Sequence, residues 1–186
     1  IRRSLEKPVY KEKLRLRSYG RTDRDSPVFM ELKKKYRSIV YKRRLTLPYD
    51  RALDCLTGAC PWPETQIGGE IRYTVDFYPD LESRVFLAYE RDSWLAPESG
   101  LRITFDDAIR FRTEELTLDS DPWGTALLGP DQVLMELKAP GAIPLWMVRL
   151  LTEMRLYKTS FSKYGTAYQL LLEREWKLSL IHISEP

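Results

Sequence analysis

The sequence predicts an α+β fold in which antiparallel strands form a sheet or barrel and helices pack outside it or at one end. Three observations favour this class: alternating segments outnumber helical ones, short hairpin-like connections join them, and proline or glycine ends most segments. The 186 residues suffice for one domain with a real core. We therefore expect a single domain over residues 1–177.

The strands are predicted from alternation with a period of two. Leu14 and Leu16 separate the cations of the first segment, so that Lys13, Arg15 and Arg17 share one face of a strand. Comparable segments recur along the chain and are bounded by turn residues. The predicted strands are Val9–Tyr19, Val28–Lys35, Ile39–Leu47, Arg84–Leu95, Leu101–Phe105 and Val133–Lys138, with Ile109–Arg112 as a short continuation of the fifth.

The helices are predicted from apolar residues at helical spacing. Ile71 and Val75 belong to the stripe of the second helix, and Trp146, Leu150 and Met154 to that of the third. We expect the stripe of the third helix to face the core. The predicted helices are Tyr49–Leu56, Glu64–Tyr78, Leu145–Arg155 and Ala167–Trp176, and residues 113–130 are predicted to be mostly loop.

Several predicted strands carry cations on one face, usually with a carboxylate among them. The alternating sets are Lys13, Arg15 and Arg17; Glu31, Lys33 and Lys35; Val40, Lys42 and Arg44; Tyr89 and Arg91; Arg102, Thr104 and Asp106; and Glu136 and Lys138. One interpretation is that these are ordinary solvated faces. The recurrence favours a second one, in which the faces line a water-filled pocket that binds a polyphosphate or a nucleoside triphosphate. Glu31, Asp106 and Glu136 then suit a divalent metal ion.

Other classes of protein are disfavoured by composition. Lys+Arg 30 against Asp+Glu 27 gives a net charge of +3, which is too balanced for a protein that coats nucleic acid. No apolar run approaches the ~20 residues that a membrane span needs. None of the nine glycines stands in a dinucleotide-binding or P-loop motif. We interpret Cys55 and Cys60 as reduced thiols near a helix end, not as a metal site or disulfide.

The last residues, Leu178–Pro186, resemble the translation of a sequencing adapter, and we predict that they are a non-native tail. Without this tail the net charge becomes +3 + 1 = +4, because Glu185 is removed, and no histidine is left, because His182 is the only one. Histidine-dependent catalytic triads, a phosphohistidine intermediate and imidazole metal sites are therefore disfavoured.

Several segments, taken in order, resemble a known family. They are Tyr10–Gly20 (YKEKLRLRSYG), Val28–Lys33 (VFMELK), Val40–Arg44 (VYKRR), Ala88–Arg91 (AYER), Leu101–Asp106 (LRITFD), Leu134–Lys138 (LMELK) and Ser160–Tyr164 (SFSKY). Each is weak alone, but seven in order over about residues 8–170 resemble the VTC domain. The VTC domain is the catalytic domain of the vacuolar transporter chaperone-type polyphosphate polymerase, and it belongs to the CYTH or triphosphate tunnel metalloenzyme superfamily.

The resemblance implies a tunnel of antiparallel strands lined by phosphate-binding side chains. It implies an enzyme that transfers the terminal phosphate of ATP to a polyphosphate chain with a divalent metal ion, Mn²⁺ or Mg²⁺. The implied catalytic cations are Arg15, Arg17, Lys33, Lys42 and Arg91. The implied substrate-binding residues are Tyr89, Arg102, Lys138, Ser162 and Lys163, and the implied metal ligand is Glu136.

The chain also departs from the family pattern. The family has an earlier strand that would precede Ile1, and a lysine where this chain has Ser160. Two other functions stay open: a tunnel triphosphatase that hydrolyses its substrate, and a non-catalytic sensor of polyphosphate or nucleotide. ATP and inorganic polyphosphate are the expected partners, without nucleic acid, in the cytoplasm. The resemblance also implies that membrane proteins associate with the full-length protein.

Overall fold

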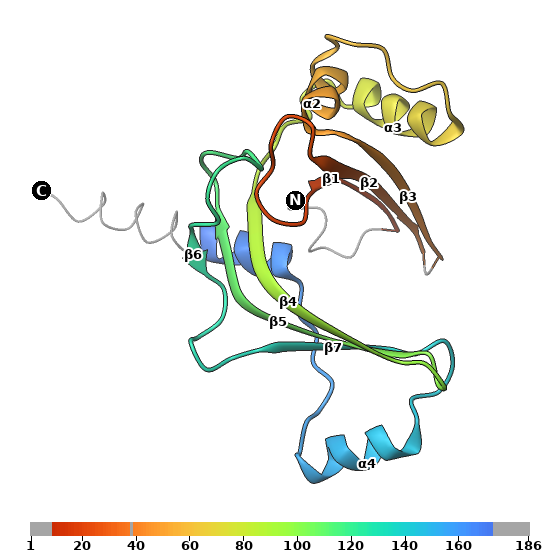
Figure 1. The fold of residues 1–186 in the computed structure, drawn as a ribbon, viewed down its shortest axis with the longest axis vertical. Coiled ribbons are helices and arrows are strands. Elements are labelled where there is room, and N and C mark those ends of the chain that lie inside the picture. The colour runs from red at the N-terminus through yellow and green to blue at the C-terminus, as the bar shows by residue number, and fades with distance from the viewer. Residues whose placement is uncertain (1–8, 38, 173–186) are drawn as a thin grey trace, which may run out of the picture. The chain divides into compact units, whose positions relative to one another are not determined.

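The computed structural model describes residues 9–37 and 39–172 of the chain (Figure 1). Its packing divides the described residues into two compact units, one formed by residues 9–37, 39–84 and 115–121 and the other by residues 85–114 and 122–172. The predicted tail lies outside the described residues. Hydrogen bonding groups the described strands into two antiparallel sheets, one in each unit, and neither closes on itself within the described residues. The α+β class with antiparallel strands and flanking helices is confirmed.

The first unit is a three-stranded sheet with two helices against one of its faces (Figure 1). Its elements are β1 (Tyr10–Arg17), β2 (Pro27–Tyr36), β3 (Ile39–Pro48), α2 (Tyr49–Thr57) and α3 (Gln66–Phe77). The strands follow one another as antiparallel neighbours in the order β1-β2-β3. The predicted hairpin of β2 and β3 is confirmed, and the predicted first strand, β1, pairs along its edge.

The core of the first unit lies between the sheet and the helices. Met30 and Leu32 of β2, Ala52 of α2 and Ile71 of α3 are all at most 1% exposed. Burying large side chains of this kind contributes about 1.5–3 kcal/mol each. The apolar residues of the alternating strands therefore determine which face of the sheet the helices cover. At the start of α3, the hydroxyl oxygen of Thr65 caps the helix by accepting from the backbone N–H of Gly68 at 3.0 Å.

The second unit is a four-stranded sheet in which β5 is the central strand. Its elements are β4 (Phe86–Ala96), β5 (Leu101–Arg112), β6 (Thr125–Ala126), β7 (Leu134–Lys138) and α4 (Leu145–Glu153), and residues 163–172 are helical. β4 pairs with one edge of β5, while β6 and β7 pair with the other. Its core consists of Ile109, Phe111, Leu127 and Ala167, the last on the helix 163–172.

One prediction about the second unit is confirmed and two need correction. Residues 109–112 continue the predicted strand 101–105 as expected, and together they form β5, which a positive φ of 43° at Ala108 does not interrupt. β6 lies inside the predicted loop 113–130, because two residues that pair with β5 are too few to give a periodic signal. The last helix begins at residue 163 instead of Ala167, and residues 173–176 of its prediction lie outside the described residues.

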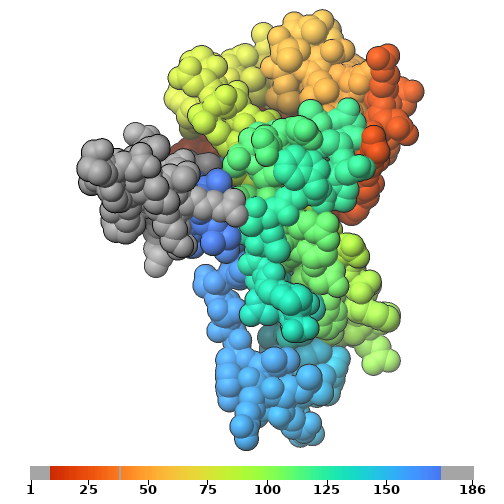
Figure 2. Space-filling model, turned by 90° about the vertical axis from the view of Figure 1, so that its left-hand side faces the viewer, coloured from red at the N-terminus to blue at the C-terminus, as the bar shows by residue number. Residues whose placement is uncertain are grey.

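The prediction that the α4 stripe faces a core is wrong. Trp146 is 52%, Leu150 42% and Met154 60% exposed, and Met147 is the buried residue of this helix. α4 lies at one end of the second unit, where its side chains form the surface (Figure 2). None of the described helices is both long and apolar enough to cross a bilayer.

Candidate functional site

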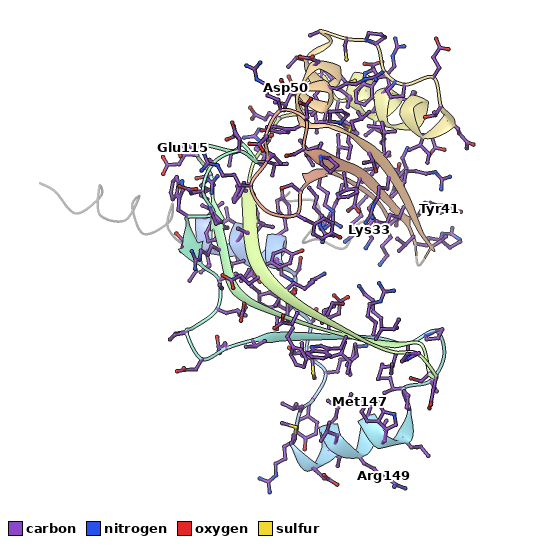
Figure 3. The ribbon with its side chains drawn as sticks, in the orientation of Figure 1. Lys33, Tyr41, Asp50, Glu115, Met147 and Arg149 are labelled. Carbon is purple, nitrogen blue, oxygen red and sulfur yellow. The ribbon has the colours of Figure 1, made fainter. Side chains whose placement is uncertain are left out.

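The face of the first sheet that points away from α2 and α3 is cationic. Directly opposed residues of antiparallel strands share a face, and the register therefore gives two rows across β1, β2 and β3. They are Lys13–Lys33–Lys42 and Arg15–Glu31–Arg44. Figure 3 shows Lys33 on this side of the sheet. The predicted alternation in β1, β2 and β3 is thus confirmed, residue by residue.

Glu31 is the centre of the second row and is 1% exposed. One of its carboxylate oxygens accepts from Arg15 Nε at 2.5 Å, and the other from Arg44 Nε at 2.8 Å. Lys42 Nζ lies 3.2 Å from the oxygen that Arg44 binds. Burial alone would raise the pKa of Glu31, but the hydrogen bonds from Arg44 and Arg15 outweigh it and lower the pKa to about 2. The carboxylate is therefore ionised and holds three cations in place.

The neighbouring row consists of three lysines. Burial lowers the pKa of Lys13, and the charges of Lys11, Lys33 and Arg15 lower it further. A like-charged group of this kind is relieved when an anion binds to it. The row is therefore suited to the oxygens of a phosphate chain, which several ammonium groups can share.

The second sheet also has a polar, partly cationic face. The pairing of β4, β5 and β7 gives three rows on it: Leu95–Arg102–Lys138, Ser93–Thr104–Glu136 and Arg91–Asp106–Leu134. Arg102 and Lys138 are thus direct neighbours, which alternation within each strand did not predict. The hydroxyl of Thr104 is buried and has no hydrogen-bond partner among the described atoms. A buried hydroxyl of this kind is a donor or acceptor available to a ligand or a water molecule.

Asp106 has the role in this sheet that Glu31 has in the first. It is 0% exposed, and Arg91 binds both of its oxygens, through Nε at 2.5 Å and Nη2 at 2.6 Å. Lys163, the first residue of the helix 163–172, donates to the same carboxylate. Burial alone would raise the pKa of Asp106, but the hydrogen bonds from Arg91 and Lys163 lower it overall. The same hydrogen bond with Asp106 raises the pKa of Arg91.

Tyr89 lies beside this pair of cations. Its ring centre is 5.0 Å from the guanidinium carbon of Arg91 and 4.5 Å from Nζ of Lys163. Tyr89 stands at a bulge, where the pairing of β4 with β5 shifts between Ala88 and Glu90. Bulges redirect a side chain, and cations over an aromatic face are attracted to it. The structure therefore brings the predicted residues Tyr89, Arg91 and Lys163 together.

Glu136 is the predicted metal ligand and is accessible. Its side chain is 47% exposed, and one oxygen lies 3.1 Å from Nζ of Lys138. Among the described residues no group of three histidine, cysteine or carboxylate side chains could hold a metal ion by itself. Mg²⁺ is commonly held by one or two carboxylates together with substrate phosphates. Glu136 fits a metal ion that is held in this way.

Two further predicted residues have contacts that bear on their roles. The hydroxyl of Ser162 accepts from the backbone N–H of Gly165 at 3.2 Å, so Ser162 caps the helix that presents Lys163. The guanidinium carbon of Arg17 lies over the ring of Tyr19, 4.8 Å from the ring centre. Arg44 is not among the site residues that the family resemblance implies, although its position two residues after Lys42 places it on the same cationic face.

The comparisons with known proteins identify the family of the chain. The family model named VTC domain matches residues 1–172, which include described parts of both units. No curated protein matches the chain. Because this model covers most of the chain, the chain belongs to the VTC domain family, which has a polyphosphate-related role.

Proposed function

We propose that the chain is a metal-dependent phosphotransferase that moves the terminal phosphate of ATP onto a polyphosphate chain. The observation that carries this proposal is a motif found in both sheets: a buried carboxylate on a strand, Glu31 or Asp106, binds cations from neighbouring strands or, for Asp106, also from a helix. Cations held in this way are already oriented before a phosphate arrives. Such preorganisation is the main requirement for stabilising charge in a phosphoryl transition state.

The arginines are held so that part of each guanidinium is left for a ligand. Arg44 and Arg91 each contact their carboxylate through Nε and Nη2, and Arg15 does the same. A guanidinium has five N–H donors, so the Nη1 side of each is left out of these contacts with the carboxylate. We assign phosphate binding to Arg15, Arg17, Lys33, Lys42 and Arg91, with support from Tyr89, Arg102, Lys138, Ser162 and Lys163.

The reaction needs no covalent intermediate on the protein. An oxygen of the terminal phosphate of polyphosphate attacks the γ-phosphorus of ATP, and the bond to the bridging oxygen breaks so that ADP leaves. The cations neutralise the phosphate oxygens and hold the two reactants in line. Glu136 would hold Mn²⁺ or Mg²⁺, which when bound adds positive charge on the phosphate oxygens. Because ATP is a cytosolic substrate, we place the reaction in the cytoplasm.

Incubation of the protein with ATP and Mn²⁺, followed by polyphosphate gel electrophoresis, tests the proposal. We expect a metal-dependent ladder of chains that Glu136→Ala abolishes. Glu98→Ala, at an exposed turn between β4 and β5, is the control and should leave the ladder unchanged. ADP and free phosphate without a ladder would contradict the transferase and establish a triphosphatase. Tight polyphosphate binding without turnover would establish a sensor.

A further inference from the structure

The two cysteines of the chain lie next to each other at the end of α2. Cys55 is in the last turn of this helix and Cys60 follows it closely, and both are free thiols. Their Sγ atoms are 3.3 Å apart. The sequence contains no other cysteine. This pair takes no part in the cationic faces described above, and it has chemistry of its own.

The backbone fixes this arrangement. α2 ends at Gly58, whose φ of 78° is the left-handed conformation that reverses the chain direction after many helices. The carbonyl oxygen of Asp54 accepts from the N–H of Ala59 at 2.8 Å and from that of Cys60 at 3.3 Å. The turn therefore returns the chain onto the last turn of the helix and holds Cys60 over Cys55 while the protein is folded.

The two thiols differ in their surroundings. Cys55 is 1% exposed and belongs to the core under the sheet, whereas Cys60 is partly exposed and packs against that core. Burial, together with the hydrogen bond and the charge of Cys60, raises the pKa of Cys55 to about 11. Because thiolates are the reactive species, Cys60 is the thiol that an oxidant in solution meets first.

We propose that Cys55 and Cys60 form an oxidant-sensitive dithiol that a peroxide converts into an intramolecular disulfide. The thiolate of Cys60 attacks one peroxide oxygen, the O–O bond breaks, and Cys60 becomes a sulfenic acid as the first water leaves. The sulfur of Cys55 then attacks the sulfur of Cys60, its proton is lost, and the sulfenic oxygen leaves as the second water. Two thiols are oxidised and one peroxide is reduced to two waters.

The geometry favours the second step over further oxidation. An S–S bond is about 2.05 Å long, so the two sulfurs must approach by only a little more than 1 Å. The unfolded chain lacks the turn at Gly58, so it holds the thiols less closely. The disulfide should therefore be more stable relative to the thiols in the folded protein than in the unfolded one, and oxidation should raise the resistance of the protein to urea.

Peroxide oxidation of the full chain tests the proposal. The protein is treated with a few equivalents of hydrogen peroxide, denatured, labelled with a maleimide and weighed by mass spectrometry. We expect a monomer without labelled thiols, about 2 Da lighter than the reduced chain and restored by dithiothreitol. With Cys55→Ser we expect a sulfenic acid at Cys60 that dimedone traps. With Cys60→Ser the remaining thiol should react at least tenfold more slowly.

A glutathione redox titration gives a second measure that does not depend on either variant. We expect the effective concentration of the two thiols to be at least tenfold higher in the folded protein than in concentrated urea. Equal values in the two states would overturn the proposal. So would a disulfide-linked dimer as the main product, or a chain in which one thiol is over-oxidised while the other stays free.

Discussion

Glu31→Gln removes the charge on which the cationic row of the first sheet depends. Glutamine has nearly the same shape as glutamate, but it cannot be ionised. The substitution leaves Arg15, Lys42 and Arg44 facing a neutral amide in a site where the native carboxylate is 1% exposed. We therefore expect the first unit to lose stability near neutral pH, without a change of volume in its core.

The size of the loss follows from the pKa of Glu31. It falls from 4.5 to about 2 in the folded protein, and a difference of this size corresponds to roughly 3 kcal/mol of stability at neutral pH. The partner side chains are partly exposed, at 57% for Arg15, 48% for Lys42 and 41% for Arg44, so water screens the interaction. We therefore expect a loss of about 2 kcal/mol in the free energy of unfolding.

The pH dependence gives the prediction its sign. A carboxyl with a lowered folded-state pKa stabilises the protein above its unfolded pKa, and this stability is lost as pH falls through the folded pKa. For Glu31 the window therefore runs from 4.5 down to about 2. The variant does not titrate at this position. The difference in unfolding free energy between the two proteins should be constant near neutral pH and shrink toward zero near the lower limit.

Urea unfolding at a series of pH values measures this difference, and hydrogen exchange of peptides from β2 and β3 assigns it to the first unit. Glu64→Gln, at an exposed position before α3, is the matched control and should change the stability little at any pH. If Glu31→Gln were as stable as the native chain at pH 7, the cations would not depend on this carboxylate. A difference that stayed the same at every pH would show that the loss arises from packing instead of charge.

Three further substitutions test other parts of the structure. Arg15→Ala should lower the rate of polyphosphate synthesis at least tenfold, about 1.4 kcal/mol in the transition state, and an unchanged rate in the gel assay would count against the proposed site. Thr104→Val should raise the unfolding free energy by up to about 1 kcal/mol, because it removes a buried hydroxyl without a described partner, while calorimetry should show weaker polyphosphate binding. Gly124→Ala should lower the free energy of unfolding by about 2 kcal/mol, measured by thermal unfolding, because the new Cβ would lie 2.4 Å from the carbonyl oxygen of Phe111. Gly129→Ala is the control and should change it little, because its Cβ would lie 3.5 Å from the nearest atom, in the side chain of Gln132.

The side-chain faces were predictable because a strand alternates with a period of exactly two residues, however the rest of the chain folds. The sets that begin at Lys13, Glu31 and Val40 needed only this rule, and the register confirms each of them. The helix α3 was predictable for a similar reason, since its apolar stripe includes the buried residue Ile71. The spacing of Leu53 and Leu56 also located α2, but Leu53 is 39% exposed, while Ala52 and Cys55 are among the residues that α2 buries.

The pairings within the site could not be predicted in the same way. Alternation gives the face on which Asp106 lies, but Lys163 reaches it from a helix 57 positions later in the sequence, and no local pattern reports such a contact. For the same reason the sequence suggested Glu31 and Asp106 as possible metal ligands, whereas the structure places cations on them. The stripe of α4 was misjudged because helical periodicity identifies an apolar face but does not supply the partner that would cover it.

The two buried carboxylates also explain how a chain with a net charge of only +3 can display concentrated cations. Without Glu31, the guanidinium groups of Arg15 and Arg44 and the ammonium group of Lys42 would repel one another whenever no phosphate is bound. The carboxylate removes this cost, yet it contacts each arginine through Nε and Nη2 and so leaves Nη1 outside its contacts. In the proposed site a phosphate adds without displacing the carboxylate. The carboxylates then keep the cations stable when no phosphate is bound, and the Nη1 groups bind the phosphate. Asp106 has the same proposed effect on Arg91.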